Sequence, residues 1–245
     1  MGYNIQMKRW WVGCSGFHYK GWKGKFYPEK LPQRKWFEFY CQSFNTIELN
    51  VTFYRFPRVA NLQTWYKQSP DEFMFTVKAP KFITHYRRFN NAARQLHDFY
   101  SIIAEGLEDK LGPVLFQMHP SMAYEEAKLE QIISSMDPAF VNVLEFRHSS
   151  WWRTNVLKAL QEAKISFCGI SHPTLPDKVY KTAPTLYYRF HGVPQLYLSS
   201  YSNKQLQQVV GEIKRKRSVS DVYMYFNNDI EVAAVSNAKT VQTLI

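Results

Sequence analysis

Short runs of apolar, β-branched and aromatic residues recur along the chain, and longer amphipathic segments separate them. Such runs predict strands, because strands buried on both faces of a parallel sheet are nearly continuous in apolar residues. Eight runs fit this description: Trp10–Cys14, Thr46–Leu49, Met74–Val77, Val114–Phe116, Val141–Phe146, Ile165–Gly169, Leu186–Phe190 and Val222–Phe226.

Helical patterns lie between most of these runs. In the clearest one, apolar residues recur at a spacing of three to four, at Leu96, Phe99, Tyr100, Ile103 and Leu107. The predicted helices span Arg34–Ser43, Val59–Lys67, Ala92–Leu107, Tyr124–Met136, Trp152–Ala163, Asn203–Lys216 and Ala233–Leu244. The gap Ser171–Pro184 lacks a helical pattern, and its prolines at 173, 176 and 184 predict a loop.

Eight strands alternating with helices over 245 residues predict an α/β fold, a single (β/α)8 TIM barrel. We expect one domain over residues 1–245, with a Pro-rich loop in place of the sixth helix. A doubly wound open sheet is the alternative fold. It usually has a glycine-rich phosphate turn after the first strand, and Gly13-Cys14-Ser15-Gly16 lacks that spacing.

Composition narrows the class of protein. Hydrophobic residues make up 45% of the chain and charged residues 21%, which excludes disorder of the whole. Mean hydropathy is −0.39, and no apolar run approaches the roughly 20 residues that a bilayer span requires. The N-terminus lacks an apolar signal region, and Gln6 stands where a myristoylation signal has Ser or Thr. We therefore expect a cytoplasmic protein with no membrane partner.

Cysteine use and charge bear on cofactors and ligands. Cys14, Cys41 and Cys168 are too few for a disulfide framework and have no zinc-ligand spacing, so we expect neither a metal nor another cofactor. The net charge is +11, which favours anionic partners. The densest basic run, Lys214–Arg217, ends a predicted helix, where cations complement the helix dipole.

Polar groups follow the predicted strands in a consistent register. Catalytic groups of barrels lie where strands end, and residues two apart on a strand share a face. The polar positions that this alternation brings to one side are Glu48, Asn50 and Tyr54 after the second strand, Lys78, Gln117, Glu145 with Arg147, Arg189 with His191, and Asn227. Confined polar groups need partners or a ligand, so this set predicts a site in the barrel mouth.

Each candidate also has a structural interpretation. Glu145 with Arg147, or Glu48 with Arg189, would equally serve as ion pairs that close the barrel. Trp151 is a packing residue or an aromatic wall for a substrate. His148 is a proton shuttle or an ordinary loop residue.

The same residues resemble the YecE-like family, the uncharacterised "domain of unknown function" 72 family. The resemblance is carried by the following segments: Gly13–Tyr19 with Trp22 and Phe26–Pro28, Glu48–Tyr54, Phe116-Gln117, Glu145–His148 with Ser150-Trp151, Arg189–Gly192, and Tyr225–Asn228 with Asn237-Ala238. They occur in order and span residues 10–244. The resemblance implies a TIM-barrel fold and no established activity. The chain differs from the family pattern at Val51, His119 and Asp229, and at Ser171-His172, where the family commonly has an Asp.

The mouth set predicts an enzyme acting on a small anionic substrate that bears phosphate or carboxylate. Glu48 and Glu145 would be an acid/base pair, with His148 or His191 as proton shuttle. The substrate-binding set would be Asn50, Tyr54, Lys78, Gln117, Arg147, Trp151, Arg189 and Asn227. We further expect Arg147 and Arg189 to bind an anion jointly, through paired guanidinium donors.

Two alternatives remain open. One is metal-assisted phosphoester cleavage, with Glu48, Glu145, His148 and His191 as ligands, although the sequence has no metal-binding motif. The other is a non-catalytic protein that binds nucleic acid or a nucleotide, supported by the +11 charge and a 17% aromatic content.

Overall fold

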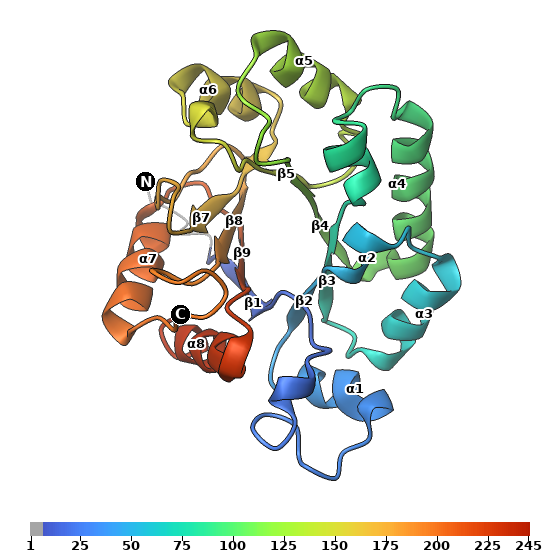
Figure 1. Ribbon diagram of the computed structural model, residues 1–245, viewed down its shortest axis with the longest axis vertical. Coiled ribbons are helices and arrows are strands. Elements are labelled where there is room, and N and C mark those ends of the chain that lie inside the picture. The colour runs from blue at the N-terminus through green and yellow to red at the C-terminus, as the bar shows by residue number, and fades with distance from the viewer. Residues whose placement is uncertain (1–6) are drawn as a thin grey trace, which may run out of the picture.

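A computed structural model describes residues 7–245. Figure 1 shows strands in a central ring with helices around them. All the strand pairs between named strands are parallel. The strands are β1 (Arg9–Cys14), β2 (Thr46–Leu49), β3 (Met74–Lys78), β4 (Leu111–Gln117), β5 (Asn142–Glu145), β6 (Ser166–Phe167), β7 (Gly169–Ser171), β8 (Thr185–Phe190) and β9 (Asp221–Phe226). The fold is of the α/β class, as predicted, and each predicted strand overlaps an observed one.

The α-helices cover the outside of this ring (Figure 1). They are α1 (Trp36–Cys41), α2 (Val51–Tyr54), α3 (Val59–Gln68), α4 (Ala93–Leu107), α5 (Glu126–Ser135), α6 (Thr154–Glu162), α7 (Asn203–Arg215) and α8 (Ala233–Gln242). The apolar stripe of α4 is buried at the five positions that its spacing predicts. No helix occurs between β7 and β8.

The strands form two sheets whose edges lie next to each other at two places in the barrel wall. Their orders are β1-β9-β8-β7 and β2-β3-β4-β5-β6. On one side, β6 and β7 are consecutive pieces of one strand position, interrupted at Cys168. The barrel therefore has eight strand positions among the described residues, although nine strands are named.

On the other side, side chains join β1 to β2. The Tyr40 hydroxyl accepts a hydrogen bond from the Cys14 amide at 2.8 Å and donates to the Thr46 carbonyl at 3.0 Å. The strands approach so closely that a Cβ on Gly13 would lie 2.3 Å from the Thr46 oxygen, so only glycine fits there.

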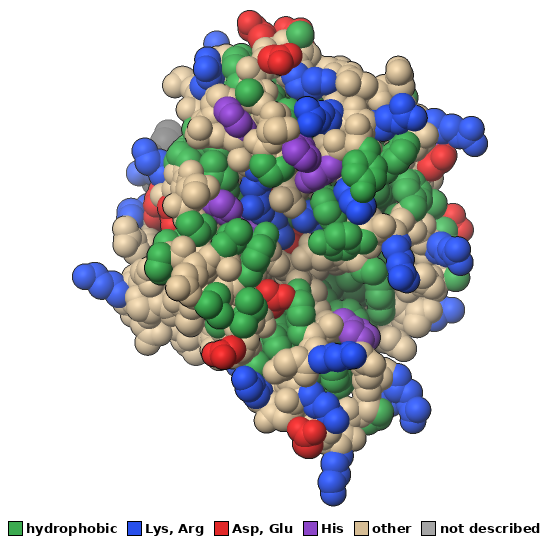
Figure 2. Space-filling model, viewed as in Figure 1, with side chains coloured by type: hydrophobic (Ala, Val, Ile, Leu, Met, Phe, Trp, Pro, Cys, Tyr) green, Lys and Arg blue, Asp and Glu red, His purple; other side chains and the backbone are tan. Residues whose placement is uncertain are grey.

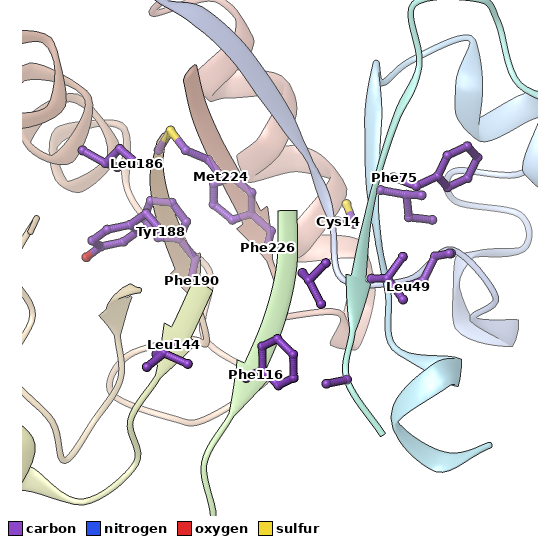
Figure 3. Close-up of a cluster of buried hydrophobic side chains, with 14 of the residues drawn as sticks. Cys14, Leu49, Phe75, Phe116, Leu144, Leu186, Tyr188, Phe190, Met224 and Phe226 are labelled. Atoms are coloured by element: carbon purple, nitrogen blue, oxygen red, sulfur yellow. The ribbon is translucent and has the colours of Figure 1, made fainter. Parts of the chain in front are cut away.

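Alternation along each strand separates two apolar layers. Outward side chains, among them Cys14, Leu49, Phe116, Phe190 and Phe226, pack in the large cluster between strands and helices (Figure 3). Inward side chains form a second cluster that contains Leu115, Val143, Cys168, Ile170, Tyr187, Tyr223 and Tyr225. The barrel interior is thus filled, and its charged groups lie at the carboxyl ends of the strands, above the hydroxyls of Thr46, Thr76 and Tyr225.

The chain after β2 departs from the predicted pattern. Alternation was expected to continue to Tyr54, but β2 ends at Leu49 and α2 begins at Val51. Thr52 anchors this turn, because its hydroxyl donates to the carbonyls of Leu49 and Lys78. In residues 7–245, no helix has both the length and the apolar character needed to cross a bilayer.

Candidate functional site in the barrel mouth

Five strands each present a polar side chain as their last inward position: Glu48 on β2, Lys78 on β3, Gln117 on β4, Glu145 on β5 and Arg189 on β8. Gln117 and Glu145 are register partners on β4 and β5, whereas Glu48 pairs with Thr76, two residues before Lys78. Figure 2 shows Lys and Arg side chains in the middle of this face, with His side chains around them.

Arg189 is the centre of a buried ion-pair network. Its Nη2 lies 2.6 Å from Glu48 Oε1, and its Nη1 lies 2.5 Å from Glu145 Oε2. The Arg189 side chain is 1% exposed, and both carboxylates are fully buried. Arg189 Nε is enclosed without a hydrogen-bond partner among the described residues. Both Nη groups are committed to carboxylates, which corrects the expectation that Arg189 contributes to joint binding of an anion.

Arg147 completes the network and retains a free donor. Its Nε contacts Glu145 Oε1, and its Nη2 lies 3.0 Å from His191 Nε2. Arg147 Nη1 makes no hydrogen bond within residues 7–245 and is not among the enclosed unpartnered atoms. This nitrogen is therefore accessible to solvent.

The pKa directions follow from these contacts. Burial raises the pKa of Glu145, but Arg147 and Arg189 outweigh burial and hold it well below the usual value. Burial lowers the pKa of His191 well below its usual value, and the two guanidiniums lower it further. Glu145 is thus a carboxylate and His191 a neutral ring at pH 7, so Glu145 is not suited to the general-acid role.

Asn227 and Tyr187 extend the network. Asn227 Nδ2 lies 3.2 Å from His191 Nδ1, and the Tyr187 hydroxyl donates to Glu48 Oε2 at 2.5 Å. The sequence interpretation did not include Tyr187. The signal was present, because Tyr187 lies two residues before Arg189 and must share its face.

Lys78 differs from the other charged members. It is 8% exposed, and its Nζ lies 4.1 Å from the centre of the Phe53 ring. Within residues 7–245, Nζ has neither a hydrogen bond nor a carboxylate within 4.0 Å, yet it is not among the enclosed unpartnered atoms. Burial first, and then Arg189, lower the pKa of Lys78 to about 7.

Three predicted site residues lie elsewhere. Tyr54 is 69% exposed on α2, because the helical turn rotates it out of the strand register. Trp151 is fully buried, stacks on Phe146 at 4.2 Å and donates from Nε1 to the Met122 carbonyl, so it is a packing residue. The His148 ring accepts from the Ser150 amide and caps the turn Ser149–Trp151.

Asn50 lies beside the mouth rather than in the network. Its Nδ2 donates to the Ser15 carbonyl at 3.2 Å. It lines a separate cavity of about 280 Å³ with Gly16–Tyr19 and Trp65. Gln117 is half-buried, and its amide makes no hydrogen bond within the described chain, so it remains available to a ligand.

The geometry also bears on the metal-dependent alternative. Residues 7–245 contain no group of three or more His, Cys, Asp or Glu side chains arranged to hold a metal ion. Of the four proposed ligands, Glu48, Glu145 and His191 lie in one network, but guanidiniums occupy both carboxylates, and His148 caps its own turn.

Comparisons with known proteins give a family and a fold. The family described as "Protein of unknown function DUF72" matches residues 11–245. The UPF0759 protein YunF of Bacillus subtilis is 24% identical over 275 residues, covering 96% of this chain and 94% of that protein.

Solved structures share the fold of this chain. A DUF72 family protein of Thermotoga maritima has a TM-score of 0.87 at 27% identity, with 96% of this chain and 98% of that chain covered. One from Enterococcus faecalis has a TM-score of 0.79 at 20% identity, with 98% of each chain covered. A putative vitamin-B12 independent methionine synthase of Listeria monocytogenes, at 10% identity and a TM-score of 0.57 over 98% of each chain, shares the fold alone.

Proposed function

The chain belongs to the DUF72 family of proteins of unknown function, as its resemblance to the YecE-like family predicted, and we propose that it is an enzyme acting on a small anionic substrate in the barrel mouth. The substrate bears a carboxylate or a phosphate. The observation that carries this proposal is the pair of free cationic donors, Lys78 Nζ and Arg147 Nη1, beside a network whose other charges cancel.

The charge count supports an anionic ligand. Arg147 and Arg189 balance Glu48 and Glu145, so the protonated Lys78 is the charge without a partner among the described mouth residues. Like charges in a confined, partly dry site repel unless a counter-charge arrives. An anion between Lys78 and Arg147 would supply that counter-charge, and Arg147 offers it a directional N–H donor.

The roles within the site follow from the contacts. Glu48 and Glu145 act mainly as supports that fix the guanidiniums, rather than as the acid/base pair that the sequence suggested. Gln117 and Asn227 orient the substrate. Lys78, with its pKa of about 7, is the mouth group best suited to accept and return a proton near neutral pH.

Calorimetric titration with phosphate, sulfate, pyruvate and a phosphosugar tests the proposal. We expect binding at millimolar concentration or below, weakened about tenfold or more in Arg147→Lys and Lys78→Met because charge-assisted hydrogen bonds are lost. The matched controls, Arg94→Lys and Lys158→Met, change side chains that are 89% and 77% exposed and should bind as wild type does. Absence of binding, or equal binding in all variants, would refute the site.

One surface feature favours nucleic-acid binding as a second candidate. Lys81 Nζ lies 5.5 Å from the Tyr54 ring and 5.4 Å from the Tyr86 ring, and both rings are about two-thirds exposed, at 69% and 66%. Exposed aromatic rings beside cations stack bases and contact phosphates. We refer to Tyr54, Lys81 and Tyr86 as the rim patch.

A further inference from the structure

Two buried lysines of this chain have opposite environments. Lys110 is 5% exposed, and its Nζ donates to the carbonyls of Tyr66 and Ser69 and to the Ser69 hydroxyl. That ammonium is satisfied and structural. Lys78 is similarly buried, but its Nζ has no such acceptor within residues 7–245 and lies 4.1 Å from the centre of the Phe53 ring.

The surroundings of Lys78 favour its neutral amine. Burial and the neighbouring Arg189 lower its pKa to about 7, against the weaker opposing effect of Glu145 and Glu48. The carboxylates cannot turn to Lys78 without leaving the guanidiniums at 2.5 and 2.6 Å. A lysine that is desolvated and next to another cation is an activated nucleophile.

We infer that Lys78 is a covalent nucleophile that forms an imine with the carbonyl carbon of a small oxo acid, whose carboxylate Arg147 holds. This rests on the proposed function and names its substrate class. Arg147 supplies the carboxylate contact through its free Nη1. The substrate is small because both side chains are nearly enclosed, at 8% exposure for Lys78 and 7% for Arg147.

The reaction balances without an oxidant or a reductant. The lone pair of Nζ forms the N–C bond as the carbonyl π electrons move to oxygen, which takes up a proton while nitrogen loses one. The carbinolamine hydroxyl then takes up one further proton from the solvent and leaves as water while the nitrogen lone pair forms the C=N bond, and the remaining N–H makes the product a protonated imine. The carboxylate of the substrate offsets the positive charge of that imine.

Borohydride trapping tests the inference on the full chain. The protein is incubated with glyoxylate or pyruvate, reduced with sodium borohydride, and examined by intact mass and peptide mapping. We expect one reduced adduct, on the peptide that contains Lys78, formed about tenfold or more faster than on the exposed Lys158. The reason is that an ordinary lysine with a pKa near 10.4 is almost wholly protonated at pH 7.

The matched probe is acetaldehyde, an aldehyde that lacks the carboxylate of glyoxylate. Glyoxylate should label Lys78 faster than acetaldehyde does, and Arg147→Lys should reduce that preference. The rate of labelling should rise with pH through about 7 and then level off, as Lys78 loses its proton. The charged and titratable groups that surround Lys78 are Glu48, Glu145, Arg147, Arg189 and His85. Burial first, and then His119 and Lys78, lower the pKa of His85 to about 4.

The outcomes separate this inference from the proposed function. Labelling spread equally over exposed lysines, or an adduct retained in Lys78→Met, would overturn the imine. Calorimetric binding of pyruvate without any adduct on Lys78 would also overturn it and leave the anion site standing. If neither binding nor an adduct occurs, both are refuted. The peptide map of the wild-type protein keeps the test decisive even if Lys78→Met does not fold.

Discussion

At the scale of single residues, the energetic cost of burying each charged group in the mouth depends on whether it has an oppositely charged partner. Arg189 loses its hydration on burial and forms ion pairs with two carboxylates, and Glu145 forms ion pairs with two guanidiniums. A buried ion pair contributes little net stability, but removing one partner leaves an uncompensated buried charge. The network is therefore costly to break, whatever its role in binding.

The substitution Arg189→Met tests this. We expect it to lower the free energy of unfolding by about 3–5 kcal/mol at pH 7, because Glu48 and Glu145 lose their shared counter-ion. Urea denaturation measures the change, with Arg94→Met at an exposed site as the control, expected to stay within about 0.5 kcal/mol of wild type. Equal stability of Arg189→Met and wild type would contradict the network.

The pH dependence of that difference has a definite sign. The pKa of Glu145 is lowered in the folded protein, so the unfolded chain takes up a proton first as the pH falls. The stability that Glu145 contributes is present above its unfolded pKa, about 4.3, and is lost as the pH drops towards the folded value. The gap between wild type and Arg189→Met should therefore narrow from pH 7 to pH 3.

At the scale of elements, β1 and β2 are neighbours in the barrel wall that belong to different sheets, so no backbone ladder joins them. Tyr40 of α1 lies against both strands, and its hydroxyl links the Cys14 amide to the Thr46 carbonyl. All three residues are fully buried, so these backbone groups have no water as an alternative partner. A helix side chain thus makes the hydrogen bonds that a backbone pairing of β1 with β2 would otherwise make.

The substitution Tyr40→Phe removes only this hydroxyl. We expect a loss of about 1–3 kcal/mol in the free energy of unfolding, the cost of leaving buried polar groups unsatisfied. Tyr66→Phe is the matched control, because the Tyr66 hydroxyl donates to Asp109 at an exposed position. If both variants lose the same stability, Tyr40 does not join the strands.

At the scale of the whole molecule, net charge and the mouth make separate contributions to binding. The charge of +11 attracts any polyanion, whereas the mouth has two free cationic groups inside a narrow opening. Attraction through surface charge weakens as salt rises, because releasing counter-ions into concentrated salt gains less free energy, and it does not depend on buried groups.

A single-stranded oligonucleotide should therefore bind with an affinity that falls steeply as salt rises. We expect the double change of Tyr54→Ala and Lys81→Ala in the rim patch to weaken this binding severalfold, through lost stacking and phosphate contact. Arg147→Lys should leave it unchanged. Fluorescence anisotropy at several salt concentrations measures both, and a loss in Arg147→Lys instead would place the nucleic acid in the mouth.

The local sequence pattern was sufficient to predict an element wherever a single physical requirement, such as an apolar buried face, fixed its residues. The strand segments and the stripe on α4 were predictable because a buried strand or helix face must be apolar whatever packs on it. Inward register brought Glu48, Glu145 and Arg189 together for the same reason, since alternation along a strand is fixed by backbone geometry.

The sequence by itself determined the α/β class, the order of strands and helices and the polar layer at the upper end of the barrel. The sequence did not predict the position of Tyr54, because the alternation of the strand stops before it. It also did not decide whether Trp151 packs in the core or lines a substrate site. Only the tertiary structure decided which charges pair, because Arg189 meets Glu48 and Glu145 across the barrel, from strands far apart in the chain. For the same reason it alone decided that Lys78 is left without a carboxylate: a pKa depends on what surrounds a group in space, and that is set by packing rather than by neighbours in sequence.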